Sequence, residues 1–410
     1  MKPSPLDTCW QAIDRLHIPA IDSLCELLRV QALGPENGGQ GEWEKSQCLQ
    51  TMFAPLVDNI TAVNAPDARV TSGQRPNLIA TIRGQGTGPR CWLVAHLDTV
   101  APGPLDAWHT PPFEPTLRDG KLFARGAEDN HQAIGSLLLL ARALQTEQLK
   151  PRGDLCFLFI ADEETGSNFG IKYLLAHADP FRADDLVVVP DGGNAEGNVI
   201  DVAEKGILQM RVTVRGKGVH ASTPHQGLNA HRLGAQVVCA LEQLHTQFPR
   251  RDDHFEPPTA TFEPTKTFSN DVSYNAIPGE HRFGIDSRML PGMTAAETLR
   301  HVTALVQSVV QSAGGTATVE PVQSMEPAPA TPDNAPVAQR VRTAVQQVLG
   351  IPAHFIGVGG ITIASYLRAA GYPAVVYTKV DDTLHTPNEY CRIANLVSDA
   401  KVLAHVVLGE

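Results

Sequence analysis

The 410-residue sequence lacks three features that mark well-defined classes of protein. It has no basic excess, because 33 Lys and Arg stand against 44 Asp and Glu, a net charge of −11. We therefore expect no nucleic-acid partner, since neutralising phosphates requires a basic surface. It has no apolar run of membrane-spanning length, and Met1 to Asp7 lack the apolar stretch of a signal peptide. We expect a cytoplasmic protein without a membrane partner.

Cysteine is also scarce and unpatterned. The seven cysteines are odd in number, and no two of them form a CxxC pair. This usage predicts a reducing compartment and no disulfide framework. A metal site in this chain would therefore have to use histidine and carboxylate ligands instead of thiolates.

The chain is too long for one ordinary core and predicts two domains. Apolar strand-like runs alternate with helical patterns in the first part of the chain, which is typical of an α/β domain. We predict a catalytic domain with a mixed sheet flanked by helices, formed by residues 1–206 and 321–410. A Pro-rich stretch at 326–332 marks the return to this domain.

The middle of the chain, residues 207–320, has a different pattern. Its predicted elements follow the order β-α-β-β-α-β, which is that of a ferredoxin-like α+β module. The second helix opens with Thr294 and Glu297 in the spacing of a capping box. The first helix is predicted to run without a break over 229–248. We therefore expect this module to be inserted into the catalytic domain.

Five residues of metal-binding type stand out in the catalytic domain. Four of them close or follow an apolar run, and the fifth opens the helix predicted over 130–146. In open α/β sheets, binding sites collect beyond the carboxyl ends of strands. Two histidines and three carboxylates suit a borderline cation such as zinc, and a shared carboxylate suits a two-metal site. The five candidates are His96, Asp129, Glu164, Asp191 and His385.

Each candidate also has an ordinary interpretation when taken alone. Asp129 could be the N-cap of the helix, and Glu128 and His131 beside it are rival ligands. Asp191 precedes two glycines and could belong to a turn. His385 could be an exposed loop histidine, and His96 a strand-end histidine beside a solvated Asp98. The case for a metal therefore depends on the five residues together.

Two further carboxylates have possible roles beside the candidates. Asp98 lies two residues after His96, on the same face of a strand, and could orient its ring. Glu163 and Glu164 are adjacent at a strand end, so one can bind a metal while the other takes a proton from the attacking water. The alternative is an acidic loop on a solvated face.

Several motifs in order resemble the M20 family of metallopeptidases and deacylases, which includes acetylornithine deacetylase, succinyl-diaminopimelate desuccinylase and glutamate carboxypeptidase. The resemblance covers nearly the whole chain. The motifs are His96–Val100, Asp119–Leu122, Arg125–Asp129, Asp162–Ser167, Lys217–Pro224, Asn275–Gly279, Asp286–Arg288 and the region of His385.

The resemblance implies two Zn²⁺ ions, for which Co²⁺ or Mn²⁺ could substitute. It implies that Asp129 bridges the ions, that His96 and Asp191 complete one site, and that Glu164 and His385 complete the other. Glu163 becomes the general base, and Asp98 orients His96. The family often has a cis peptide bond after the bridging aspartate, here Asp129–Asn130.

The resemblance also assigns roles to three residues of the inserted module, which it implies is a lid and dimerisation domain. His220 would stabilise the oxyanion, often across a homodimer, Arg288 would grip a substrate carboxylate, and Asn275 would help hold the acyl or carboxylate end. Outside the resemblance, His220 is only a histidine after a Gly-rich turn and Arg288 a strand-end charge.

The sequence departs from the family pattern near the expected substrate pocket. The departures are Ala124, Asn130–Ala133, the loop Gly359–Ala364 and the pair Thr378–Lys379. We predict a zinc-dependent amidohydrolase that acts on an N-acyl amino acid. The alternatives are a di- or carboxypeptidase acting on small peptides, a single-domain zinc aminopeptidase, which the insertion disfavours, and a non-catalytic relative.

Overall fold

The computed structural model describes residues 3–269 and 273–409. The chain divides into two compact units. The first comprises Met1–Val202, Thr331–Ile356 and Thr362–Glu410, and the second comprises Ala203–Ala330 and Gly357–Ile361. The division falls four residues before the boundary expected at 206/207 and ten residues after the one expected at 320/321. The short segment Gly357–Ile361 also packs with the second unit.

The first unit is built on an eight-stranded mixed sheet. Strand β5 is parallel to both of its neighbours, and β18 is parallel to β9, whereas β1 with β4, β4 with β8 and β10 with β18 are antiparallel. The α/β fold with a mixed sheet is thus confirmed. In sheet order the strands are β1 (Asn59–Ala62), β4 (Leu78–Ile82), β8 (Leu155–Ile160), β5 (Cys91–His96), β9 (Leu186–Asn194), β18 (Ala374–Lys379), β10 (Val199–Glu204) and β17 (His354–Val358).

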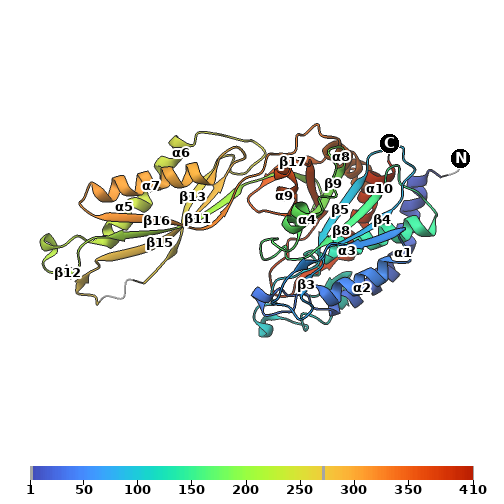
Figure 1. Ribbon diagram of the computed structural model, residues 1–410, viewed down its shortest axis with the longest axis horizontal. Helices are drawn as coiled ribbons and strands as arrows, with labels where there is room; N and C mark the ends of the chain where they lie inside the picture. The colour runs from blue at the N-terminus through green and yellow to red at the C-terminus, as the bar shows by residue number, and fades with distance from the viewer. Residues whose placement is uncertain (1–2, 270–272, 410) are drawn as a thin grey trace. The chain divides into compact units, whose positions relative to one another are not determined.

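Helices cover both faces of this sheet (Figure 1). Successive side chains of a strand point to opposite faces, so Leu93 of β5 belongs to one buried cluster and Val94 to the other. The larger cluster includes residues of α1 (Pro5–Arg29), α3 (His131–Thr146), α8 (Pro336–Leu349) and α10 (Ile393–Leu408). The smaller one includes residues of α4 (Ile171–His177) and α9 (Ile363–Ala369). Burial on both faces explains why these strands read as continuous apolar runs.

Parallel pairing brings the carboxyl ends of three strands to one edge of the sheet. Strand β5 pairs in parallel with both β8 and β9. The segments at the ends of these strands therefore meet, and they contain His96, Glu164 and Asp191. The sheet thus positions His96 and Asp191, and it brings the loop that carries Glu164 to the same edge.

The second unit has the predicted ferredoxin-like topology. Its strands are β11 (Gly206–Arg215), β13 (Thr261–Thr267), β15 (Glu280–Met289) and β16 (Thr316–Met325), in the sheet order β13-β15-β11-β16 with every pairing antiparallel. Helices α5 (Ala230–Ala240) and α7 (Ala295–Gln311) pack together and contribute to the core of this unit (Figure 1). Thr294 accepts the N–H of Glu297 at the start of α7, as the capping pattern predicts.

The prediction of one continuous helix over 229–248 is wrong. Helix α5 ends at Ala240, and a 3-10 turn over Leu241–Gln243 separates it from the short α6 (Leu244–Gln247). After the turn, His245 and Phe248 both pack against Phe262 of β13. A change from α to 3-10 geometry redirects side chains at a helix end, and tertiary packing here overrides the local helical pattern.

The remaining elements are short. No helix within residues 3–269 and 273–409 has the length and apolar character of a membrane span. The remaining α-helix is α2 (Trp43–Phe53). The remaining strands are β2 (Ala65–Pro66), β3 (Gln74–Arg75), β6 (Thr116–Arg118), β7 (Lys121–Phe123), β12 (Val219–His220), β14 (Ala276–Ile277) and β19 (Tyr390–Arg392).

Candidate metal centre

The first group of candidates, here called the strand-borne cluster, consists of His96, Asp129 and Asp191. His96 is the last residue of β5, and only 1% of its surface is exposed. Its Nδ1 lies 3.0 Å from the backbone oxygen of Asp98, so its Nε2 faces the cluster. This Nε2 lies 2.8 Å from Asp129 Oδ1 and 3.7 Å from Asp191 Oδ1.

Asp191 lies within strand β9 and not in a turn. The interpretation of Asp191 and its two glycines as a turn is therefore wrong. The strand continues to Asn194 because Thr378 and Lys379 of β18 pair with Gly193 and Asn194. Pairing with β18 on both sides of Asp191, at Val189 and at Gly193, thus holds this segment of β9 in the sheet.

The second group, here called the loop-borne cluster, consists of Asp129, Glu164 and His385. His385 Nε2 lies 3.0 Å from Asp129 Oδ2 and 3.1 Å from Glu164 Oε2. The His385 side chain is 48% exposed, and the residue has a left-handed backbone with φ of 59°. Asp129 therefore directs one oxygen to each histidine and belongs to both clusters.

Asp129 does not cap the helix that follows it. Helix α3 begins at His131, its N-cap residue is Asn130, and no side chain accepts a capping hydrogen bond there. The Asp129–Asn130 peptide bond is cis, as the resemblance implied. The Asp129 carboxylate is thus directed to His96 and His385 instead of the helix N-terminus.

Asp98 holds the two adjacent glutamates by their backbone. Its Oδ1 accepts the N–H of Glu163 and its Oδ2 accepts the N–H of Glu164, both at 3.0 Å. Its Oδ1 also lies 3.4 Å from His96 Nδ1, farther than its own backbone oxygen. The Asp98 backbone thus makes the shorter contact to the ring, and its side chain fixes the turn that carries Glu163.

The rival ligands beside Asp129 are engaged elsewhere. Both oxygens of Glu128 accept hydrogen bonds from the segment 381–383. The His131 ring lies 2.6 Å from the Lys45 ammonium through Nε2 and 2.9 Å from the Gly126 backbone oxygen through Nδ1. Neither residue belongs to a group of candidate ligands in the described chain.

The charges of the clusters shift the pKa values of their members in opposite directions. Burial opposes protonation of His96, but Asp191 and Asp129 raise its pKa well above the usual range. Hydrogen bonds that His385 donates to Asp129 and Glu164 raise its pKa to about 10. Burial alone would raise the pKa of Asp129, yet His385 and His96 lower it below its usual range.

The glutamates next to the clusters shift upward. Burial raises the pKa of Glu164 to about 7, and the neighbouring Asp129 adds to the effect. Burial also raises the pKa of Glu163 well above its usual range. His96 opposes that shift, whereas Asp191, Glu164 and Asp129 increase it. Glu163 thus lies within electrostatic reach of both clusters.

The donor set fits divalent cations with borderline ligand preference. Each cluster offers one imidazole nitrogen and two carboxylate oxygens, and the ligand atoms within a cluster all lie within 4.8 Å of one another. Ligand atoms about 2.0–2.2 Å from a common zinc ion lie roughly 3–4 Å apart, so small shifts suffice. With acids and imidazoles only, the set favours zinc or a similar ion.

The residues assigned to the inserted module lie in the second unit. Ser222 contacts His220 Nδ1 through its hydroxyl oxygen at 2.7 Å and through its backbone nitrogen at 3.2 Å. The Asn275 Nδ2 atom lies 3.4 Å from His220 Nε2. Arg288 donates to Asp286 through Nε at 2.7 Å and to the Gly359 backbone oxygen through Nη1 at 2.7 Å. The loop at Gly359, where the sequence departs from the family pattern, thus contacts Arg288 within this unit.

The sequence analysis did not predict the hydrogen bonds that two residues make at the centre. Asn130, noted only as a departure, donates through Nδ2 to Asp191 Oδ1 at 2.6 Å and to the Pro190 backbone oxygen at 2.8 Å. Glu389 accepts four hydrogen bonds from the segment 125–129. The contact partners of both are distant in the chain, so no local pattern signalled them.

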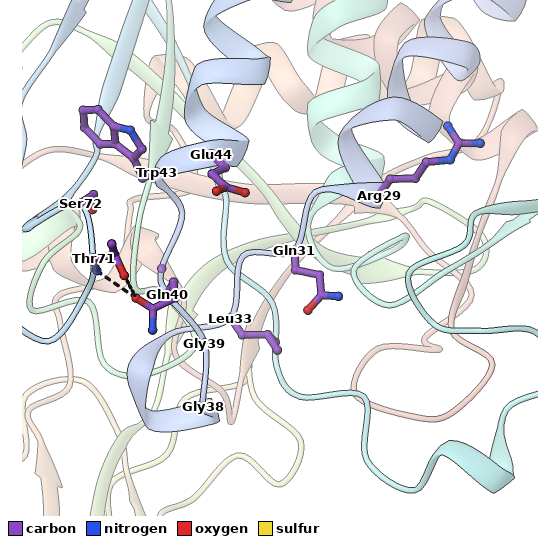
Figure 2. Close-up of a pocket in the computed structure, with 11 residues that line it drawn as sticks. Arg29, Gln31, Leu33, Gly38, Gly39, Gln40, Trp43, Glu44, Thr71 and Ser72 are labelled. Atoms are coloured by element: carbon purple, nitrogen blue, oxygen red, sulfur yellow. Dashed lines mark hydrogen bonds between the residues drawn. The ribbon is translucent and has the colours of Figure 1, made fainter.

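A separate hollow of about 770 Å³ lies in the first unit. Figure 2 shows its lining, in which Gln40 accepts hydrogen bonds from the backbone N–H and the hydroxyl of Thr71. Arg29, Gln31 and Glu44 also line it, and all three side chains are exposed. We assign this hollow no ligand.

Residues 92–409 match the model of peptidase family M20/M25/M40. The chain belongs to this family. As a member of family M20, it is a metal-dependent hydrolase of amide or peptide bonds. The resemblance found in the motifs is therefore confirmed.

Two relatives of this M20 hydrolase span nearly the same length. An uncharacterized metallohydrolase of Methanocaldococcus jannaschii is 33% identical over 95% of this chain and 98% of its own. A succinyl-diaminopimelate desuccinylase of Alkalilimnicola ehrlichii is 30% identical over 86% of this chain and 92% of its own.

Solved structures support the M20 fold. A tripeptidase of Staphylococcus aureus superimposes with a TM-score of 0.76 at 21% identity, over 95% of this chain and 97% of that one. A Bacillus subtilis protein described as a dinuclear metal-binding peptidase of family M20 gives 0.65 at 14% identity, over 96% and 98%. At these identities the likeness establishes the fold alone.

Proposed function

We propose that this M20 hydrolase is a two-zinc amidohydrolase that removes the acyl group from an N-acyl amino acid. One observation carries the proposal: Asp129 belongs to two groups of three ligand-type residues at once. A shared carboxylate between two imidazole-containing clusters is the arrangement that a pair of ions about 3.5–4 Å apart needs. Co²⁺ or Mn²⁺ would suit the same donors.

Glu163 is the proposed general base. The metal pair, when bound, polarises the scissile carbonyl and lowers the pKa of the attacking water from about 15.7 towards ~7. Glu163 lies within electrostatic reach of both clusters, and the Asp98 carboxylate holds its backbone. It takes the proton from the water as the water attacks, and it returns this proton to the leaving amine.

The inserted module supplies the proposed substrate contacts. His220 can donate a ring N–H to a developing oxyanion. Arg288 uses Nε, Nη1 and Nη2 for Asp286 and Gly359, and its further N–H donors suit a substrate carboxylate. Asn275 would hold the acyl or carboxylate end, and the family resemblance supports a homodimer.

The acyl-amino-acid class is favoured over small peptides by one finding. The relative named as a desuccinylase is 30% identical over most of both chains. The tripeptidase structure, at 21% identity, is more distant in sequence. We therefore place N-succinyl and N-acetyl amino acids first and peptides second.

A substrate panel on the zinc-reconstituted enzyme tests the proposal. The panel should contain N-acetyl and N-succinyl derivatives of acidic, basic and apolar amino acids, together with matched dipeptides of the same carboxyl-terminal residues. We expect the highest kcat/KM on an N-acyl amino acid. A dipeptide preferred by tenfold or more would contradict the deacylase assignment.

The role of Glu163 has a separate test. Glu163→Ala should retain two ions per chain and lose turnover by about 10²–10⁴-fold, the usual contribution of a general base. Glu44→Ala, which changes an exposed glutamate of the same unit, is the matched control and should keep full activity. Near-normal turnover in a folded Glu163→Ala protein would refute the assignment.

A further inference from the structure

Two of the three loops that carry ligands of the loop-borne cluster each place a buried carboxylate against the backbone of the other. One loop covers residues 125–130 and contains Asp129, and the other covers residues 381–390 and contains His385. Neither ligand lies within a helix or strand, and His385 is half exposed. Some other contact must therefore set the separation of Asp129 and His385.

The first carboxylate is Glu128, which is 4% exposed. Its Oε1 accepts the backbone N–H of Asp381 at 2.7 Å. Its Oε2 accepts the backbone N–H of Thr383, and the Thr383 hydroxyl at 2.9 Å. Glu128 thus reaches from the Asp129 loop and fixes the backbone two residues before His385.

The second carboxylate is Glu389, which is 1% exposed. Its Oε2 accepts from Arg125 Nη1 at 2.7 Å and from the Gly126 N–H at 2.9 Å. Its Oε1 accepts from the backbone N–H groups of Glu128 at 2.9 Å and Asp129 at 3.0 Å. Glu389 thus reaches from the His385 loop and fixes the backbone of the shared ligand.

Burying two carboxylates is unfavourable unless each is fully hydrogen-bonded. Here five of the seven donors are backbone N–H groups of the opposite loop, and the other two are Arg125 Nη1 and the Thr383 hydroxyl. Such charge-assisted bonds fix position as well as charge. We call this pair, Glu128 and Glu389, the carboxylate clasp.

The strand-borne cluster is supported by different contacts. Asn130 donates to Asp191 Oδ1 at 2.6 Å and accepts the backbone N–H of His96 at 3.3 Å. Both of these ligands lie in strands of the sheet. None of these contacts of Asn130 involves the Glu128 side chain, so we expect a change in Glu128 to affect them little.

We propose that Glu128 and Glu389 are positioning residues, and that the clasp sets metal occupancy of the loop-borne cluster separately from that of the strand-borne cluster. This inference rests on the proposed metal centre. Glu128 is the more selective of the two, because Glu389 also holds the backbone of Asp129, which both clusters share.

Glu128→Gln is the sharpest variant. Both Glu128 oxygens accept from backbone N–H groups, so an amide places one N–H against another N–H whichever way it is turned. The loop-borne cluster should then lose affinity by about 10–100-fold, as is usual when a partner that orients a ligand is lost. The strand-borne cluster should keep its affinity.

The matched control is Asp185→Asn. Asp185 is a buried carboxylate of the same unit that accepts from Arg90, the backbone N–H of Arg182 and the Trp92 indole, away from both clusters. Its loss should lower stability and leave both affinities unchanged. If Glu128 acted only on fold stability, Glu128→Gln and Asp185→Asn would have the same effect on zinc affinity.

The experiment titrates metal-free protein with Zn²⁺ against a chelator of known affinity and measures bound zinc by mass spectrometry. Wild type and Asp185→Asn should bind two ions, and Glu128→Gln should hold one tightly. Adding His385→Ala to Glu128→Gln should remove nothing further, whereas adding His96→Ala should release the remaining ion.

The result of the zinc titration distinguishes an error in the proposed function from an error in the clasp. A wild type that binds fewer than two ions overturns the proposed function and the clasp with it. Two ions of unchanged affinity in folded Glu128→Gln overturn the clasp alone. If Glu128→Gln does not fold, Thr383→Val removes one donor to Glu128 and should weaken the second ion by several-fold; unchanged binding there also overturns the clasp.

Discussion

The two clusters of the candidate metal centre share Asp129 but differ in how they are built. The strand-borne cluster takes His96 and Asp191 from neighbouring strands, and its histidine is almost fully buried. The loop-borne cluster takes Glu164 and His385 from loops, and its histidine is half exposed. The sheet positions the first, whereas the second depends on carboxylates that connect loops.

This difference separates stability from metal binding. Ligands on central strands are part of the core, so changing them disturbs the fold as well as the site. Ligands on loops are positioned by hydrogen bonds, so changing them should act mainly on the metal. Functional groups on loops held by a rigid scaffold are common in enzymes.

The largest contrast is expected between two histidine variants of the metal-free protein. His96→Ala removes the buried partner of Asp129 and leaves like charges together, which should lower the free energy of unfolding by about 3–5 kcal/mol. His385→Ala removes a half-exposed partner and should lower it by less than ~1 kcal/mol. Urea unfolding at neutral pH measures both, and equal losses would contradict the contrast.

Asn130→Leu should weaken the strand-borne cluster. The variant removes the amide that orients Asp191, so zinc affinity at this cluster should fall by about 10–100-fold while the loop-borne cluster is less affected. Asn77→Leu is the control, because Asn77 is a buried amide that donates to the Val63 and Phe169 backbone oxygens. A fall confined to the loop-borne cluster would reverse the assignment of Asn130.

Asp98→Asn should affect the base more than the metals. An amide at this position can accept only one of the two N–H groups of Glu163 and Glu164. The loss of one charge-assisted bond, roughly 1.5 kcal/mol, predicts a fall in kcat of about tenfold with two ions still bound. Steady-state kinetics with metal analysis checks this, and a loss of activity proportional to lost metal would contradict it.

The smallest expected effect concerns His281 of the second unit. Burial and the neighbouring His231 lower the pKa of His281 below 6.5, opposite to the shifts of His96 and His385. The unfolded chain then binds the proton more readily, so this contribution is present above pH ~6.5 and is lost as the pH falls.

In His281→Leu, the free energy of unfolding should therefore depend less steeply on pH below pH ~6.5. Between pH 6.5 and 5, the wild type should lose stability faster than the variant, by at most about 1.4 kcal/mol per pH unit. Parallel urea unfolding series of the metal-free proteins measure the difference. Equal slopes would show that the His281 pKa is not lowered.

Sequence and structure agree best where apolar periodicity controls the geometry. Buried parallel strands predicted the positions of His96, Glu164 and Asp191, because the strand ends must meet at one edge. The ferredoxin-like order of the inserted module also followed from its elements. His385 follows the apolar run at 374–377 only after a polar segment, so this run alone did not place it at the strand ends.

The contacts that complete the site could not be predicted from the chain. Glu389 reads as an ordinary acidic residue of a polar loop, and its donors lie about 260 residues away. The local pattern suggested Asp98 as an orienter of His96, yet the shorter contact is its backbone oxygen. The break after Ala240 depends on packing against Phe262, which no helical pattern encodes.

The central claim is that Asp129 joins two metal ions. A crystal structure of zinc-loaded protein, with anomalous scattering recorded on both sides of the zinc edge, tests it most directly. The account predicts two peaks, one among His96, Asp129 and Asp191 and one among Asp129, Glu164 and His385. A single peak, or peaks away from Asp129, would contradict it.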